Sequence, residues 1–243
     1  MSTPDAAKPL NDQAHAGVLR VFPPDPGATR VVLVRHGEAE CNLNRVVGGV
    51  KGCTGLTALG RRQVAALADR LYESGELRGA STLYSSVLPR AVETAERLRA
   101  VVGPGPAALG PVVERCDLCE LHPGESDGMS WDDVVEVLGV PDWDRDPGVP
   151  IAPGGESWSG FIVRAADAVR DLARRHPGEM IVAAVHAGVI EACMISFLGV
   201  SSEVYRRGWV HIVHASMTES AWVPGEDRWI LMRFNDACGI PAG

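Results

Sequence analysis

The chain has 243 residues, of which 46% are hydrophobic and 22% are charged, so it can bury a substantial core and has an ordinary globular composition. Its formal net charge of -8 argues against nucleic acid and an anionic membrane as partners, because both bind basic surfaces. No apolar run approaches the roughly 20 residues that span a bilayer, and we see no secretory signal. Six scattered cysteines do not form a disulfide framework. We therefore expect a cytoplasmic protein.

The first 29 residues differ from the rest of the chain. They carry prolines at positions 4, 9, 23, 24 and 26 and show little apolar periodicity. We expect residues 1–29 to be a flexible leader with a short edge strand at Val18–Phe22. Residues 30–243 are expected to form a single domain.

The strongest local signal is the apolar run from Val31 to Val34. These four aliphatic residues predict a strand buried on both faces, as in a parallel sheet covered by helices. The run ends at Arg35 and His36, so both lie at the carboxyl end of a strand, where open α/β sheets bind ligands. Gly37 then allows a tight turn and the close approach of a ligand.

The rest of the chain alternates between helical and strand-like segments. A polar loop over 38–55 precedes a helix that Thr57 caps and that runs to about Ser74. The irregular stretch 121–153 is a long insertion, which is typical of a lid. The other expected elements are a strand at Ser81–Ser85, a helix from Ser86 or Val87, a short strand at Val112–Val113, a short helix near Trp131–Leu138, a helix from Ser157, a strand at Met180–Val185, a helix to Leu198, and strand-like runs near His211–Ser216, Ser220–Val223 and Trp229–Phe234.

The Arg35-His36-Gly37-Glu38 run at the end of the first strand resembles the histidine phosphatase superfamily, also called phosphoglycerate mutase-like. The resemblance implies an α/β fold, a three-layer α/β/α sandwich with a mostly parallel central sheet and a lid insertion at about 121–153. Further blocks that carry the resemblance follow in the family's order: Asn42, Arg45 and Gly48, then Leu56–Gly60 with Gln63, Ser86–Thr94, Leu118–Glu120, Gly154–Ser157 and Val185–Gly188.

The resemblance also assigns roles to individual residues. It implies that His36 is a nucleophile that forms a phosphohistidine, and that His186 stabilises the transferring group. Glu120 follows the strand after Arg90, where family members carry their general acid. Asp117 and Glu114 are the competing carboxylates if this register is shifted.

Arg35 and Arg90 suit a phosphoryl group for a simple chemical reason. Guanidinium groups are planar and permanently charged, and they bind phosphate oxygens bidentately. Together with the two histidines they supply the positive charge that a metal ion supplies elsewhere, so we expect no metal and no cofactor. Gly37 and the accessory residues Asn42 and Arg45 are expected to contact the substrate, on a loop that is slightly longer here than in the family.

The lid composition separates two activities of the family. Mutases carry a Tyr, a Lys and an Arg-Arg pair in the lid, whereas Glu120–Pro153 contains no Lys, no Tyr and only Arg145. The segment is instead acidic, which disfavours a substrate with several negative charges outside the phosphate site. We therefore favour a hydrolase for a small phosphomonoester with a neutral or cationic alcohol, such as a sugar. A cofactor-dependent phosphoglycerate mutase and a catalytically silent phosphate-binding module remain alternatives, and a homodimer follows from the resemblance alone.

Three further features are assigned no catalytic or metal-binding role. Cys116 and Cys119 form a lone C-x-x-C, and a zinc site would need a second ligand pair that the sequence does not offer. His122 is read as an exposed loop residue close enough to Glu120 to touch substrate. His211 and His214 alternate in a strand-like run and are read as structural or surface residues.

Overall fold

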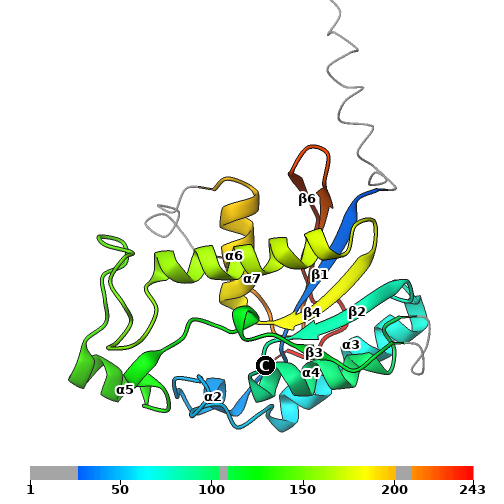
Figure 1. The fold of residues 1–243 in the computed structure, drawn as a ribbon. Helices are drawn as coiled ribbons and strands as arrows, with labels where there is room; N and C mark the ends of the chain where they lie inside the picture. Colours follow the sequence, from blue (N-terminus) through cyan, green and yellow to red (C-terminus); the bar gives the residue numbers. More distant parts are fainter. Residues whose placement is uncertain (1–26, 104–108, 201–209, 243) are drawn as a thin grey trace, which may run out of the picture.

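The computed structural model describes residues 27–103, 109–200 and 210–242 (Figure 1). The predicted edge strand at Val18–Phe22 lies outside these residues. A six-stranded sheet in the order β3-β2-β4-β1-β5-β6 forms the centre. The strands are β1 (Thr29–Arg35), β2 (Ala80–Ser85), β3 (Val113–Glu114), β4 (Met180–Val185), β5 (Met217–Val223) and β6 (Arg228–Asp236). The pairs β1–β4, β4–β2 and β2–β3 are parallel, whereas β5 runs antiparallel to both β1 and β6.

Helices cover both faces of this sheet, and the alternation of side chains along β1 explains why. Val31 and Leu33 pack in one buried cluster with α6 (Trp158–Arg175) and α7 (Ala187–Phe197). Val32 points to the opposite face, where α3 (Ala58–Ser74) and α4 (Pro89–Arg99) pack. Successive side chains of a strand face opposite sides, so a continuous apolar run must be covered twice. The expected α/β/α sandwich is therefore confirmed (Figure 1).

Most predicted boundaries agree with the structure because they rest on local capping chemistry. The hydroxyl of Thr57 accepts a hydrogen bond from the N–H of Gly60 at 2.9 Å and begins α3. Ser157 caps α6 through the N–H of Gly160 at 3.2 Å. Each bond satisfies an otherwise unpaired donor of the first helical turn.

The lid contains the short helix α5 (Trp131–Asp133) followed by a π-helical turn at Val134–Leu138. It lies next to the loop after β1, which contains the one-turn helix α2 (Glu40–Leu43) that the sequence interpretation missed (Figure 1). A β-bridge between Val46 and Ser130 joins the two segments. Among the described helices, none is long and apolar enough to cross a membrane.

The expected strand at His211–Ser216 is wrong. This segment is irregular, and Ala215 has a positive φ of 55°. Only its end pairs with β1: the N–H of Ala215 donates to the carbonyl of Arg35, and the carbonyl of Ser216 accepts the N–H of Arg35, both at 3.1 Å. The rest bonds to side chains: the N–H of Val213 donates to Asn235 Oδ1 at 2.8 Å, and the carbonyl of Ile212 accepts from the Arg35 guanidinium. The segment therefore turns back across the end of β1 before β5 begins.

Candidate active site

Four of the predicted residues meet at one edge of the sheet because their strands pair in parallel. Arg35 ends β1 and His36 follows it, while His186 follows β4. The register pairs Arg35 with Val185, and the N–H of His36 donates to the carbonyl of Val185 at 3.0 Å. Arg90 comes from the first turn of α4, directly after β2. Carboxyl ends of parallel strands meet at one edge, which is where such sheets place their ligands.

The imidazole of His36 is held in a defined tautomer. Its Nδ1 lies 2.6 Å from the carbonyl oxygen of Gly37, and Arg90 Nε donates to its Nε2 at 3.1 Å. A carbonyl can only accept, so the ring proton resides on Nδ1 and the lone pair on Nε2. Burial first, then the charges of Arg90 and the other basic neighbours, hold the pKa of His36 well below 6.5. His36 Nε2 is therefore an unprotonated nitrogen at neutral pH.

His186 is fully buried beside it, with the two ring centroids 5.1 Å apart. Its Nε2 lies 2.7 Å from the hydroxyl oxygen of Ser86, which itself accepts the N–H of Leu88. Ser86 can therefore still donate its hydroxyl proton to His186 Nε2, and in the tautomer that accepts this proton the ring N–H lies on Nδ1. Burial first, and then the nearby arginines, lower the pKa of His186 well below 6.5.

Two buried nitrogens here have no hydrogen-bond partner within the described residues: Nδ1 of His186 and Nε of Arg35. Buried polar atoms in proteins are nearly always paired, so such atoms need an explanation. Nε of Arg35 is a donor, and Nδ1 of His186 is a donor in the tautomer whose Nε2 accepts from Ser86; both belong to residues that surround His36. A bound anion is the group that would satisfy them.

Arg35 is anchored from the segment that follows α7. Its Nη1 donates to the carbonyl of Ile212, and its Nη2 donates to Nε2 of His214 at 2.8 Å. Burial lowers the pKa of Arg35 to about 10, opposed by the Glu120 carboxylate, so the guanidinium remains charged at neutral pH. Burial, and then Arg35, lower the pKa of His214 to about 3.

His214 was therefore misread as a structural or surface residue of a strand. Its ring centroid lies 5.7 Å from that of His36, and it orients Arg35 from 179 positions away in the chain. No motif or spacing in the sequence links the two residues, because the contact depends on the irregular turn that precedes β5.

Arg90 is held by the loop after β1. Its Nη1 donates to the carbonyl of Gly48 at 2.6 Å and lies 3.9 Å from Cys41 Sγ. A Cβ atom at Gly48 would lie 2.5 Å from Cys41 Sγ and 3.1 Å from the Arg90 guanidinium. Position 48 therefore needs a glycine for this loop to approach the arginine.

Glu120 is the carboxylate that the structure brings to this edge. It lines the same cavity as Arg35, His36 and Arg90, whereas Asp117 and Glu114 do not. One carboxylate oxygen accepts the N–H of Gly188 at 3.0 Å, and the other accepts the N–H of Leu121 at 3.1 Å. Asp117 instead forms an ion pair with Arg115 at 2.5 Å.

Two backbone N–H groups at this edge of the sheet donate to side chains. The N–H of Gly188, at the start of α7, goes to Glu120. The N–H of Gly37 goes to the hydroxyl of Thr94 at 3.3 Å. A Cβ at Gly37 would lie 2.5 Å from the carbonyl oxygen of Gly60, so this glycine lets the end of β1 pack against α3.

The accessory residues separate in space. Asn42 lines the cavity, and its Oδ1 accepts the N–H of Ala39 at 3.1 Å. Arg45 is not among the lining residues and pairs with Asp132 of the lid at 3.3 Å, with both side chains exposed.

The cavity has a volume of about 330 Å³. A second cavity of about 600 Å³ opens beside it, and Arg35, Trp143, Trp158, Ala187 and Glu191 line both. The lid supplies Trp143, whose ring centroid lies 5.7 Å from that of Trp158 on α6. The cavity around His36 thus continues into a larger, partly aromatic cavity under the lid.

Residues 31–237 match the model of the histidine phosphatase superfamily, branch 1. The chain belongs to this superfamily. The match covers every residue of the site described above.

Individual relatives within the superfamily differ in the activity that their names state. The chain is 30% identical over 215 residues to a metal-independent phosphoserine phosphatase of Arabidopsis thaliana, an alignment that covers 86% of this chain and 82% of that protein. It is 32% identical over 173 residues to phosphoglycerate mutase-like protein 4 of the same plant, covering 69% and 70%. Among solved structures, a mycobacterial glucosyl-3-phosphoglycerate phosphatase complexed with VO3 superposes with a TM-score of 0.68 at 25% identity, over 85% of this chain and 98% of that one.

The depressed pKa of His214 predicts a stability change with pH. Above pH 6.5 this ring is neutral in both states; below it, the unfolded chain takes up a proton that the folded protein takes up only near pH 3. The free energy of unfolding should therefore fall as the pH falls, by about 1.4 kcal/mol per pH unit for this residue. His214→Gln should remove that part of the slope in urea unfolding between about pH 5 and about pH 6. His211→Gln, at an exposed position, is the control, and an unchanged slope in His214→Gln would contradict the prediction.

Proposed function

We propose that the protein is a metal-independent phosphomonoester hydrolase that works through a phosphohistidine on His36. The observation that supports this most directly is the unprotonated Nε2 of a buried histidine, in contact with the guanidinium of Arg90 and in one cavity with that of Arg35. A nucleophilic nitrogen and the positive charge for a phosphoryl group occupy one cavity.

The unpaired donors define how the phosphate would sit. Nε of Arg35 and Nδ1–H of His186 bind nonbridging oxygens, and Arg90 moves its Nε–H from His36 to the phosphate. This move frees the lone pair of His36 Nε2 for attack on phosphorus. The bond to the leaving oxygen breaks as the bond to Nε2 forms, and the arginines stabilise the charge on the transferring group.

Glu120 acts as the proton carrier in both steps. Its protonated form gives a proton to the leaving alkoxide, and the resulting carboxylate then takes a proton from the water that attacks the phosphohistidine. Its position in the cavity, beside Arg35 and the start of α7, supports this role over Asp117 and Glu114. The reaction releases the alcohol first and inorganic phosphate second.

The substrate is proposed to be a small phosphomonoester whose alcohol is neutral or cationic, such as a sugar or an amino alcohol. Asp142 and Asp144 of the lid and Glu191 of α7 line the larger cavity beside the phosphate site. These carboxylates repel a second anionic group and attract an ammonium group. The names of the phosphoserine phosphatase and glucosyl-3-phosphoglycerate phosphatase relatives support hydrolysis of a small phosphomonoester. Both named substrates also carry a carboxylate, so the proposed charge of the alcohol rests on the acidic cavity alone. A cytoplasmic location and a homodimer remain predictions.

Replacement of the nucleophile should abolish turnover. Wild-type protein is expected to release phosphate from p-nitrophenyl phosphate in excess chelator, and His36→Ala should lose at least about 1000-fold in kcat because covalent catalysis fails. Rapid quenching should trap an acid-labile, alkali-stable phosphoprotein in wild type and in the control His176→Ala, which lines neither cavity, but not in His36→Ala. Turnover that survives in His36→Ala would refute the assignment. Tight phosphate binding without hydrolysis would favour the silent module, and phosphoryl transfer to a second hydroxyl of the substrate would favour the mutase.

Removing the proton donor should matter most for poor leaving groups. Glu120→Gln should lower phosphate release from alkyl phosphates by about 100-fold to 10000-fold. With p-nitrophenyl phosphate, whose leaving group needs no proton, the same variant should retain a burst of p-nitrophenol followed by slow hydrolysis of the intermediate. Asp117→Asn is the matched control for the competing carboxylate. Loss of the burst in Glu120→Gln would contradict this role, as would an equally large drop in alkyl phosphate hydrolysis in Asp117→Asn.

The acidic cavity predicts an order of substrates. We expect kcat/KM to be higher for glucosamine 6-phosphate, glucose 6-phosphate and phosphoethanolamine than for 3-phosphoglycerate. Replacing both Asp142 and Asp144 by Asn should reduce the ratio of kcat/KM between these substrates and 3-phosphoglycerate by about tenfold. Asp146→Asn, a lid residue that does not line the cavity, should leave it unchanged. A wild-type preference for 3-phosphoglycerate would exclude the proposed substrate class.

A further inference from the structure

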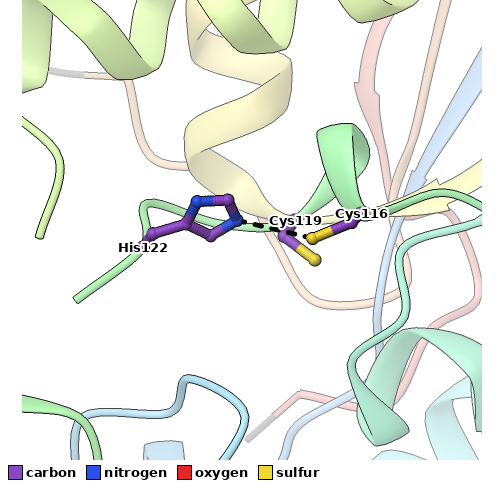
Figure 2. A group of neighbouring side chains, drawn as sticks. All are labelled: Cys116, Cys119 and His122. Carbon is purple, nitrogen blue, oxygen red and sulfur yellow. Dashed lines mark hydrogen bonds between the residues drawn. The ribbon is translucent and has the colours of Figure 1, made fainter. Parts of the chain in front are cut away.

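Three side chains of metal-ligand type meet outside the residues that line the phosphate cavity. The ligand atoms of Cys116, Cys119 and His122 all lie within 4.8 Å of one another. Figure 2 shows the imidazole of His122 directed at Cys116, and the distance from Nε2 to Sγ is 3.8 Å. The sequence interpretation counted only the cysteine pair; the fold adds the third ligand.

Local backbone geometry explains why the two thiols point the same way. Residues Cys116–Leu118 form a 3₁₀ turn, and the N–H of Cys119 donates to the carbonyl of Cys116 at 3.0 Å. Side chains three residues apart are eclipsed in a 3₁₀ turn, so both sulfurs lie on one side. The chain is extended after Cys119, and three residues later the side chain of His122 points back to the two thiols.

The segment that carries the ligands is fixed from α6. Arg164 Nη1 donates to the carbonyls of Asp117 and Cys119 at 2.8 and 3.1 Å, and its Nη2 donates to the carbonyl of Glu120 at 3.3 Å. These bonds hold the backbone on both sides of Cys119. A metal site needs ligands whose positions are set before the ion binds, and this partly buried guanidinium supplies that restraint.

Glu156 provides the second observation. Its Oε2 lies 3.7 Å from Nδ1 of His122, the ring nitrogen that faces away from the thiols, and it accepts the N–H of His122 at 2.8 Å. The same carboxylate is held by Arg164 at 2.7 Å. Histidine ligands commonly donate their second ring N–H to a carboxylate, which leaves the other nitrogen free for the metal.

We propose that Cys116, Cys119 and His122 bind a divalent cation of the zinc class, with water in the fourth position. Tetrahedral Zn²⁺ separates its ligand atoms by about 3.6 Å for S–N and about 3.8 Å for S–S, which the present cluster approaches. Two thiolates and one imidazole favour Zn²⁺ over oxygen-seeking cations. Binding breaks two S–H bonds, forms two Zn–S bonds and releases both protons to solvent. Cys116 is exposed, which gives the ion an entry path and leaves room for the water.

The ion would not touch the phosphate. None of its three ligands lines the phosphate cavity, whereas Glu120 and Leu121, which lie between them in the chain, both do. The site therefore restrains the loop that carries Glu120 without entering the reaction. The inference is independent of the proposed hydrolysis, because chelator-resistant turnover and metal binding are separate measurements.

Titration of the reduced, chelator-stripped full chain with Co²⁺ tests the site. We expect one Co²⁺ per chain, with the visible d–d absorption of a tetrahedral ion and a thiolate-to-cobalt charge-transfer band in the near ultraviolet. Zn²⁺ should displace the Co²⁺ and abolish both bands. Zn²⁺ should also raise the midpoint of thermal unfolding of wild type, because it binds the folded chain more tightly than the unfolded one.

Two ligand variants and two controls decide the outcome. Cys116→Ser, at an exposed position, and His122→Asn should each weaken Co²⁺ binding by more than about 100-fold. Cys238→Ser and His211→Asn, also exposed, should bind as wild type does. A missing charge-transfer band in the reduced protein would overturn the proposal, as would a band that persists in both ligand variants. Cys116→Ser and His122→Asn keep the test valid if a change at buried Cys119 prevents folding.

Discussion

An imidazole kept neutral by burial and by positive neighbours is the constraint on which this site depends. His36 is 3% exposed, and its Nδ1 is committed to the carbonyl of Gly37. The lone pair on Nε2 exists only because a proton there would be buried beside Arg90 and near Arg35. The same charges that suppress protonation are those that would bind a phosphate.

Keeping two arginines and three histidines together under the lid requires the rest of the fold. Arg35 is tied to the segment before β5 through Ile212 and His214, and Arg90 is tied to the loop after β1 through Gly48. Each guanidinium is oriented by groups that accept its other N–H donors, so little motion is needed when an anion arrives. Such preorganised charge is the principal means by which proteins stabilise a transferring phosphoryl group.

The segment from Cys116 to His122 links this centre to α6. Arg164 holds its backbone carbonyls, and Glu156 holds both Arg164 and His122. Glu120 reaches the cavity from this restrained stretch and caps the first turn of α7. The carboxylate thus lies on a restrained loop, whereas the acidic residues of the lid line the neighbouring cavity.

The sequence alone determined the features that depend on residues close together in the chain, namely buried strands and the first residues of helices. The apolar runs at Val31–Val34 and Met180–Val185 determined two buried parallel strands, and Thr57 and Ser157 determined where two helices begin. Arg35, His36 and His186 could be placed at strand ends for the same reason. The tertiary structure alone decided the contacts between distant segments, His214 on Arg35 and Glu120 on the start of α7. It also decided that His122 faces Cys116, six residues before it. Those contacts follow from irregular backbone whose hydrogen bonds go to side chains far along the chain, and no periodicity in the sequence records such bonds.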